Sequence, residues 1–237
     1  MSSISLDKLL SNDTIIENKI TIIAFITFAI LLLVLFILVI ISLFKSKDDD
    51  EKFINTSMSQ GKNKNKNIII IRHGEKPEPD TGVLNCLGFN RAIQLAPLFT
   101  KKYPKPERIY TVKPDIHEDG TLSKARPLMT IEPYAIMNNI PINIEYTYEK
   151  DDLKKLAKEL YDAAPGYYII CWEHKNIKPL VDNILSEYKN KTIKVPEWDG
   201  KDFDTIYDIF YNDSMNELSL SFTKQNLNNV SSICPMI

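Results

Sequence analysis

Residues 67–77 read Asn-Ile-Ile-Ile-Ile-Arg-His-Gly-Glu-Lys-Pro, and this stretch decides the fold. Its four consecutive β-branched residues predict a strand buried on both faces, because such a strand has no solvent side and needs no polar alternation. The strand brings Arg72 and His73 to its carboxyl end, where open α/β sheets usually bind ligands. Only four of the 29 basic residues are arginine. The planar guanidinium suits phosphate or carboxylate in a way that lysine does not.

Length and composition allow one globular domain of ordinary size and an additional segment, since the chain has 237 residues, 44% of them hydrophobic and 25% charged. The net charge of -2 argues against general nucleic-acid binding. Three cysteines, Cys86, Cys171 and Cys234, are odd in number and widely spaced. They suit a reducing compartment and lack the spacing of metal ligands.

The additional segment is residues 20–44, which carry no charge and are interrupted only by Thr21, Thr27 and Ser42. This run exceeds the ~20 residues that a helix needs to cross a bilayer, so we interpret it as a transmembrane helix. A cleaved signal peptide would have a shorter apolar core of about 7–15 residues and a small-residue cleavage site. Lys-Ser-Lys at residues 45–47 follows instead.

Lysines are concentrated on one side of this predicted span. Six lie just after it and two before it: Lys45, Lys47, Lys52, Lys62, Lys64 and Lys66, against Lys8 and Lys19. The positive-inside rule therefore predicts a single-pass membrane protein with its carboxyl-terminal domain in the cytosol and residues 1–19 on the other side. Residues 45–65 lack periodicity and predict a flexible linker, and residues 66–237 form the domain.

Helices and strands are expected to alternate through this domain. Helices are predicted over 85–103, 123–138, 151–163 and 177–188, and further strands over 108–112, 142–148, 167–172, 206–211 and 218–222. The order predicts an α/β fold, a three-layer α/β/α sandwich with a mainly parallel sheet, closed by an antiparallel pair at one edge. Ser123 is expected to cap its helix, with Pro127 in the first turn.

Residues 167–174 read Tyr-Tyr-Ile-Ile-Cys-Trp-Glu-His and repeat the design of the first strand. Parallel strands would place His174 at the same sheet edge as Arg72 and His73, and Arg126 could add a second guanidinium. Such a cluster selects a compact anion, and phosphate is the simplest candidate. A neutral imidazole is also a competent nucleophile. The hypothesis is that a phosphoryl group moves onto a histidine and then to water.

Four segments occur in the order found in the histidine phosphatase superfamily, and the chain resembles the branch that includes phosphoglycerate mutases. They are Ile-Ile-Arg72-His73-Gly74-Glu75, Leu84-x-x-x-Gly88-x-x-Arg91-Ala92, Ser123-Lys124-Ala125-Arg126-Pro127 and Trp172-Glu173-His174. The resemblance spans roughly residues 67–211 and implies a phosphoglycerate-mutase-like fold.

By this resemblance His73 would be the phosphorylated nucleophile, Arg72 and Arg126 would bind the phosphoryl oxygens, and His174 would stabilise the transition state. The chain departs from the family where Lys175 follows His174, because that position is usually glycine. No cofactor is expected, and no metal, since arginine and histidine can balance the phosphate charge.

The proton donor for the leaving group is left open among five carboxylates: Glu173, Glu149, Asp151, Glu75 and Asp80. We favour Glu173 because it lies at a strand end beside His174. The alternative is that Glu173 faces away, since strand neighbours alternate sides. Glu75 is expected to be an exposed loop acid.

Other polar and aromatic residues have simpler interpretations. His117 is expected at the surface, and Arg91 is expected to pair with a nearby carboxylate. Trp172 is predicted to lie in the core, and Trp198 with Phe203 to anchor the last loop onto the sheet.

These observations predict a membrane-anchored phosphatase of the histidine acid type, a phosphoric monoester hydrolase that acts through a phosphohistidine. One alternative is a catalytically weak or inactive phosphate-binding module that acts as a membrane scaffold. Another is a phosphomutase, although the loops between the motifs are short. The phosphorylated substrate is of a class that the sequence does not identify.

Overall fold

The computed structural model describes residues 33–34, 36–37 and 65–235. The chain divides into two units, Met1–Lys62 and Asn63–Ile237. Apart from the helical residues 33, 34, 36 and 37, the predicted span and nearly all of the predicted linker lie outside the described residues. Among the residues that are described, no helix is both long and apolar enough to cross a membrane.

The second unit is built on a six-stranded sheet with the order β5-β2-β6-β1-β7-β8. Its strands are β1 (Asn65–Arg72), β2 (Arg108–Val112), β5 (Ile142–Tyr146), β6 (Gly166–Trp172), β7 (Thr205–Asn212) and β8 (Glu217–Lys224). Strands β5, β2, β6 and β1 are parallel, whereas β7 is antiparallel to both β1 and β8. The predictions of a mainly parallel sheet and of an antiparallel closing pair are confirmed.

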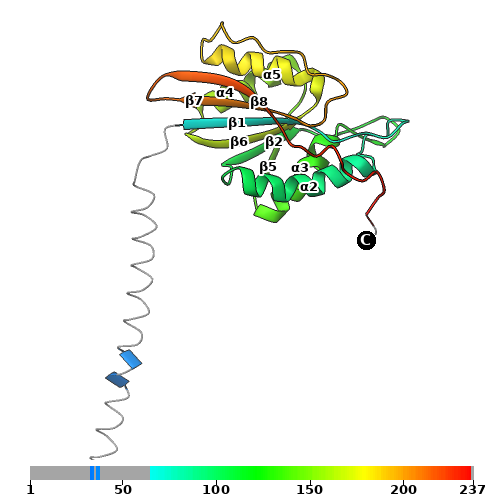
Figure 1. Cartoon of the computed structure of the whole chain (residues 1–237), viewed down its shortest axis with the longest axis horizontal. Coiled ribbons are helices and arrows are strands. Elements are labelled where there is room, and N and C mark those ends of the chain that lie inside the picture. Colours follow the sequence, from blue (N-terminus) through cyan, green and yellow to red (C-terminus); the bar gives the residue numbers. More distant parts are fainter. Residues whose placement is uncertain (1–32, 35, 38–64, 236–237) are drawn as a thin grey trace, which may run out of the picture. The chain divides into compact units, whose positions relative to one another are not determined.

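Two layers of helices cover the sheet, with α2 (Cys86–Lys102) and α3 (Arg126–Asn138) on one face and α4 (Lys150–Asp162) and α5 (His174–Glu187) on the other (Figure 1). The alternation of β1 explains this arrangement. Ile69 and Ile71 pack with α2 and α3, and Ile68 and Ile70 pack with α4 and α5. All four side chains are at most 1% exposed, and Trp172 is fully buried, as predicted.

The start of α3 differs from the prediction. Ser123 does not cap this helix, because it lies in β4 (Leu122–Ser123), which pairs with β3 (Asp115–Ile116) in a short hairpin. Ala125 occupies the cap position and makes no side-chain bond there. The strands of the hairpin have two residues each and are largely exposed, so they carry no periodic signal. His117 lies exposed in this hairpin, as predicted.

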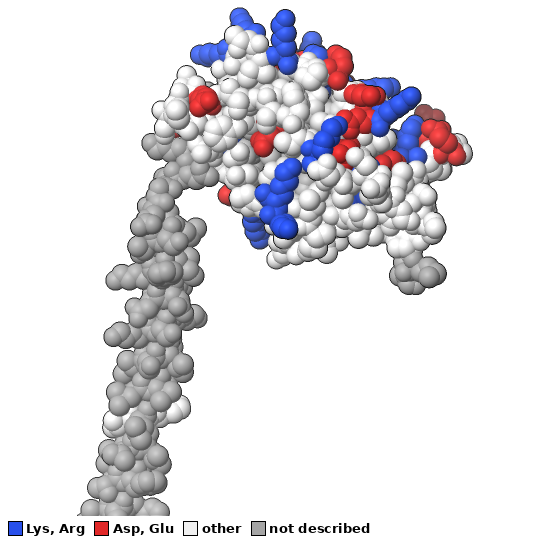
Figure 2. Space-filling view, in the orientation of Figure 1, with Lys and Arg blue, Asp and Glu red and all other residues white. Residues whose placement is uncertain are grey.

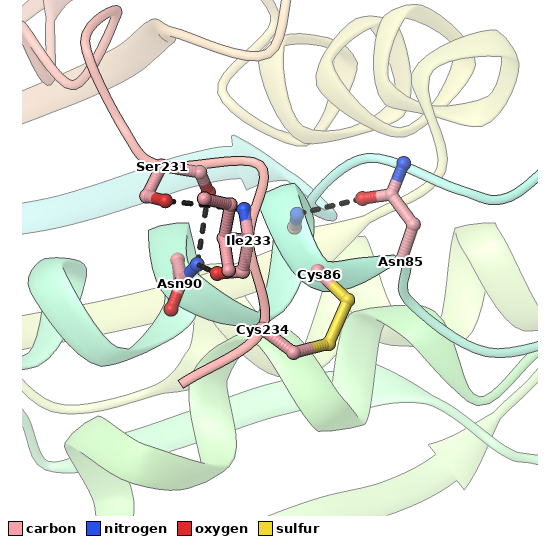
Figure 3. The surroundings of a disulfide bond; sticks show 7 residues. Asn85, Cys86, Asn90, Ser231, Ile233 and Cys234 are labelled. Atoms are coloured by element: carbon pink, nitrogen blue, oxygen red, sulfur yellow. Dashed lines mark hydrogen bonds between the residues drawn. A yellow bond between two sulfur atoms is a disulfide. The ribbon is translucent and has the colours of Figure 1, made fainter. Parts of the chain in front are cut away.

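The expectation of reduced cysteines is wrong for two of the three. Cys86 and Cys234 form a disulfide across a sequence separation of 148 residues, and Cys171 is buried and free. Figure 3 shows how the carboxyl-terminal tail folds back across the start of α2. Asn90 Nδ2 fastens the tail by donating to the carbonyls of Ser231 (2.8 Å) and Ile233 (2.7 Å). Sequence spacing gives no signal for a pair that only the tertiary fold brings together.

The two helical layers present different surfaces. On the face shown in Figure 2, lysines and acidic residues gather over the upper part of the domain, whereas the lower part, where α2 and α3 lie, is mostly uncharged. Apolar side chains exposed on these two helices include Phe89, Ile93, Ile136 and Met137. The layers bury cores of similar composition but differ in what they show to solvent.

Candidate active site

His73 follows β1 directly, and its backbone N–H donates to the carbonyl of Trp172 at 3.0 Å. Its ring Nδ1 lies 2.7 Å from the carbonyl oxygen of Gly74. A carbonyl oxygen only accepts, so Nδ1 carries the proton and Nε2 keeps its lone pair. The ring is 3% exposed. Burial above all, together with the charges of Arg72 and Arg126, lowers the pKa of His73 to about 3, although the bond to Gly74 opposes this. The imidazole is therefore neutral near pH 7.

Two glycines allow α2 to approach the turn after His73. A Cβ on Gly74 would lie 2.9 Å from the carbonyl oxygen of Gly88, and a Cβ on Gly88 would lie 2.4 Å from that of Glu75. The N–H of Gly74 donates to Thr130 Oγ1 at 2.8 Å, which links the same turn to α3. Both glycine positions thus serve the close packing of α2 and α3 behind the imidazole.

Arg72 is held by the loop that precedes β7. Its Nη1 donates to the carbonyls of Gly200 (2.8 Å) and Asp202 (3.1 Å), and its Cζ lies 3.7 Å from the centroid of the Phe203 ring. The Nε atom is buried and has no hydrogen-bond partner among the described residues. One part of the guanidinium is therefore fixed, while Nε remains available to an anion.

Arg126 begins α3, and its Nη1 lies 2.5 Å from Asp80 Oδ1. Its Nε is likewise buried and without a partner in the described part of the chain. Asp80 also accepts from the N–H of Gly82 (2.9 Å) and from Lys76 Nζ (3.3 Å). Slight burial opposes the effect, but these hydrogen bonds lower the pKa of Asp80 to about 2. The ionised carboxylate of Asp80 thus forms a salt bridge with Arg126.

His174 is the first residue of α5, and Glu173 is the cap of this helix. Glu173 Oε2 accepts from the N–H of Lys175 and from Asn176 Nδ2, both at 2.9 Å. Its Oε1 lies 2.7 Å from His174 Nδ1, close enough for a charge interaction but not aligned as a hydrogen bond. Burial and Arg72 lower the pKa of His174, and Glu173 opposes them. Lys175 lies in the first helical turn, where glycine is not required.

The structure gathers the predicted residues at one edge of the sheet. The charges of Arg72, Arg126 and His174 all act on the His73 ring. The carbonyl of Gly200 binds Arg72, and a Cβ on Gly200 would lie 3.6 Å from His174 Nε2, so this loop contacts both sides of the cluster. Two imidazoles and two guanidiniums thus lie near one another at this edge, and together they suit a compact anion.

The remaining candidate carboxylates lie in other settings. Glu75 is not an exposed acid as expected, because it is buried and accepts three hydrogen bonds of 2.7–3.1 Å from Arg91. The expectation that Arg91 pairs with a carboxylate is thereby confirmed. Glu149 and Asp151 are exposed at the start of α4, and Asp151 lies 3.4 Å from Lys154 Nζ.

The loop that holds Arg72 was not predicted to belong to the site. Trp198 anchors this loop as expected, since it is 8% exposed and its Nε1 donates to the carbonyl of Asp202 at 2.8 Å. Phe203, however, stacks on Arg72. The loop residues match no motif, and the only signal was an aromatic residue in a polar segment.

The sequence matches no protein-family model and no curated protein sequence. Among solved structures, the chain is similar to a provisionally assigned phosphohistidine phosphatase SixA from Agrobacterium tumefaciens, with 15% identity, a TM-score of 0.44 and coverage of 67% of this chain and 97% of the other. For a provisionally assigned SixA from Nakamurella multipartitia, the identity is 12%, the TM-score is 0.44, and the match covers 67% of this chain and 94% of the other. For a phosphoglycerate mutase from Plasmodium falciparum, the identity is 13%, the TM-score is 0.40, and the match covers 73% of this chain and 94% of the other. These similarities are too distant to assign a family.

Proposed function

We propose that this chain is a membrane-anchored histidine phosphatase that hydrolyses a phosphomonoester through a phosphohistidine at His73. The observation that carries the proposal is the state of the buried imidazole. Its Nδ1 is committed to the carbonyl of Gly74, so the lone pair is on Nε2, and the ring is neutral. A site that only held phosphate would gain more from a charged imidazolium than from a neutral one.

The surrounding cations support a phosphoryl group as the electrophile. The buried Nε atoms of Arg72 and Arg126 are donors without protein partners among the described residues, and phosphoryl oxygens would satisfy them. Nε2 of His73 would attack phosphorus, and His174 would stabilise the charge that develops on the phosphoryl oxygens. In the second step, water would attack the phosphohistidine and release phosphate.

The test is hydrolysis of p-nitrophenyl phosphate by the purified full chain without added metal. His73→Ala is expected to abolish turnover and the phosphoenzyme trapped by rapid quenching in alkaline detergent, in which phosphohistidine is stable. His117→Ala is the matched control, since this histidine is exposed in the β3–β4 hairpin and should leave both unchanged. Turnover that survives in His73→Ala would refute the proposal. Phosphate binding without a trapped phosphoenzyme would favour a phosphate-binding module.

Membrane anchoring is a separate part of the proposal, and it rests on the uncharged run at residues 20–44. The full chain is expected to stay with membranes after alkaline extraction. A variant that lacks residues 1–45 should be released while keeping its activity toward p-nitrophenyl phosphate. Release of the full chain by alkali would refute membrane anchoring but would not affect the proposed phosphatase mechanism.

A further inference from the structure

The carboxylates nearest to the β1 end act as hydrogen-bond acceptors. Glu75 accepts three bonds from Arg91. Asp80 accepts from Arg126, Lys76 and Gly82. A carboxyl group that is to protonate a leaving group must carry a proton and point it outward, whereas bonds from guanidinium and ammonium groups stabilise the ionised form. Neither group is arranged to act as an acid.

Glu173, at the β6 end, is arranged in the same way. Its Oε2 accepts two hydrogen bonds, from the N–H of Lys175 and from Asn176, and it caps α5. The Oε2 atom is thus engaged at the amino terminus of α5, a position that favours a negatively charged side chain. Its Oε1 lies 2.7 Å from His174 Nδ1 and places a carboxylate beside the ring that should face the phosphoryl group.

We infer that Glu173 positions His174 rather than donating a proton, and that the substrates are phosphoryl compounds whose leaving group departs as a stable anion. Acyl phosphates and phosphates of acidic phenols belong to this class, whereas phosphates of aliphatic alcohols do not. The inference rests on the proposed phosphohistidine mechanism and narrows its substrate.

The reaction balances without an acid on the protein. The Nε2 lone pair of His73 forms the N–P bond, the P–O bond to the leaving group breaks, and its electron pair leaves with the oxygen as an anion. Water then forms a new P–O bond, the N–P bond breaks, and its electron pair returns to Nε2. Both protons of the water stay on the product, which leaves as dihydrogen phosphate. The two cationic guanidiniums of Arg72 and Arg126 stay charged throughout.

The first measurement is kcat/KM of the full chain for p-nitrophenyl, phenyl and butyl phosphate, in order of falling leaving-group acidity. General acid catalysis typically contributes about 10²–10⁴-fold, so the butyl ester is expected to react slower than the p-nitrophenyl ester by at least about 10²-fold. Acetyl phosphate should react at least as fast as p-nitrophenyl phosphate. Turnover of butyl phosphate within about tenfold of the p-nitrophenyl ester would overturn the inference, because a difference that small needs an acid.

The second measurement assigns the role of Glu173. Glu173→Gln keeps an acceptor for the cap, so kcat/KM for p-nitrophenyl and butyl phosphate should fall by the same small factor. Glu173→Ala should lower both further, and equally, because His174 loses its support. A loss that is about 10²-fold greater for butyl phosphate would identify Glu173 as the acid. Glu217→Gln, an exposed acid at the start of β8, is the matched control.

Quenching in alkaline detergent, in which phosphohistidine is stable, separates this inference from the proposed function. Phosphohistidine formed from acetyl and p-nitrophenyl phosphate, but not at a comparable rate from butyl phosphate, supports both. Phosphohistidine formed at similar rates from acetyl, p-nitrophenyl and butyl phosphate would keep the proposed function and refute the substrate class. The absence of phosphohistidine with any of them refutes both.

Discussion

The carboxyl ends of β1 and β6 share one sequence pattern, a buried strand followed by a histidine, but the two histidines lie in different surroundings. Both strands are buried, parallel and adjacent, with Arg72 opposite Trp172, and each is followed by a histidine at the same sheet edge. His73 is 3% exposed, and its ring is fixed by the carbonyl of the next residue. The His174 side chain is 19% exposed and lies beside the carboxylate of the preceding residue, which caps a helix.

The difference shows that the residues flanking the histidine set its chemistry. Gly74 turns the chain away into a loop, presents its carbonyl to Nδ1 and lets α2 pack against the turn. Glu173 instead starts a helix at once and places a negative charge beside His174. One imidazole is therefore buried, neutral and suited to attack, and the other is half-buried and suited to stabilise charge.

The largest expected effect tests this division directly. His73→Ala should lower kcat/KM for p-nitrophenyl phosphate by about 10⁴-fold or more and remove the phosphoenzyme, because His73 is the only imidazole that the described residues place at the β1 end. His174→Ala should cost about 10²–10³-fold, as for the loss of one electrostatic stabiliser, and still form the phosphoenzyme. Steady-state kinetics together with quenching in alkaline detergent measure both. Equal losses in the two variants would mean that the two histidines are not divided in this way.

What the sequence predicted and what it missed follow one physical rule. The strands, both histidines and Arg72 were predicted because each depends on a local apolar run and its first polar neighbours. The pairing of Arg91 with a carboxylate was predicted, but its partner Glu75 and the stacking of Phe203 on Arg72 were missed, because these contacts link segments that are distant in sequence. No periodic pattern reports such contacts.

The disulfide was not predicted for the same reason, and it is a further difference between the two strand ends. It fastens the tail to the start of α2, the helix that packs behind His73. Disulfides persist mainly in oxidising compartments, which argues against the cytosolic placement inferred from the lysines. Mass spectrometry of alkylated protein taken from cells would find the Cys86–Cys234 pair oxidised on the exterior or lumenal side, and as free thiols in the cytosol.

The second prediction concerns the stability that this bond gives. Cys234→Ser should lower the free energy of unfolding by about 2–5 kcal/mol, because the bond closes a long loop in the unfolded chain. Urea unfolding of the oxidised wild type and the variant measures the difference. Cys86→Ser should match Cys234→Ser, and the double variant should be no worse than either single one. Additive losses would contradict a shared bond.

The third prediction compares Gly88 of α2, which packs against the turn after β1, with Gly200, which lies beside His174 at the β6 end. Gly88→Ala should destabilise the fold by about 1–3 kcal/mol, because its Cβ would lie 2.4 Å from the backbone oxygen of Glu75. Gly200→Ala has ordinary space, with its Cβ 3.6 Å from His174 Nε2, and should keep normal stability. Its methyl group would lie in van der Waals contact with His174 Nε2 and should lower kcat/KM several-fold by covering that side of the imidazole. Unfolding curves and kinetics check the pair, and the reverse pattern would show that the β6 end is the more tightly packed.

The last prediction concerns the pH dependence of stability that the buried His73 creates. Burial lowers its folded-state pKa from 6.5 to about 3, so between these values the unfolded chain binds a proton that the folded chain does not. Stability should therefore fall as pH decreases from about 6.5 toward 3, by up to about 1.4 kcal/mol per pH unit from this group.

His73→Gln should flatten this part of the stability profile, measured by urea unfolding between pH 7 and pH 4, since glutamine does not titrate. The exposed His117→Gln is the matched control and should retain the wild-type slope. His174 is less buried and should contribute a smaller slope in the same direction. A profile that His73→Gln leaves unchanged would mean that the pKa of His73 is the same in the folded and the unfolded chain, so that the folded imidazole also gains a proton below about pH 6.5. The contrast between the two strand ends would then fail at its origin, because a protonated His73 has no lone pair on Nε2 with which to attack phosphorus.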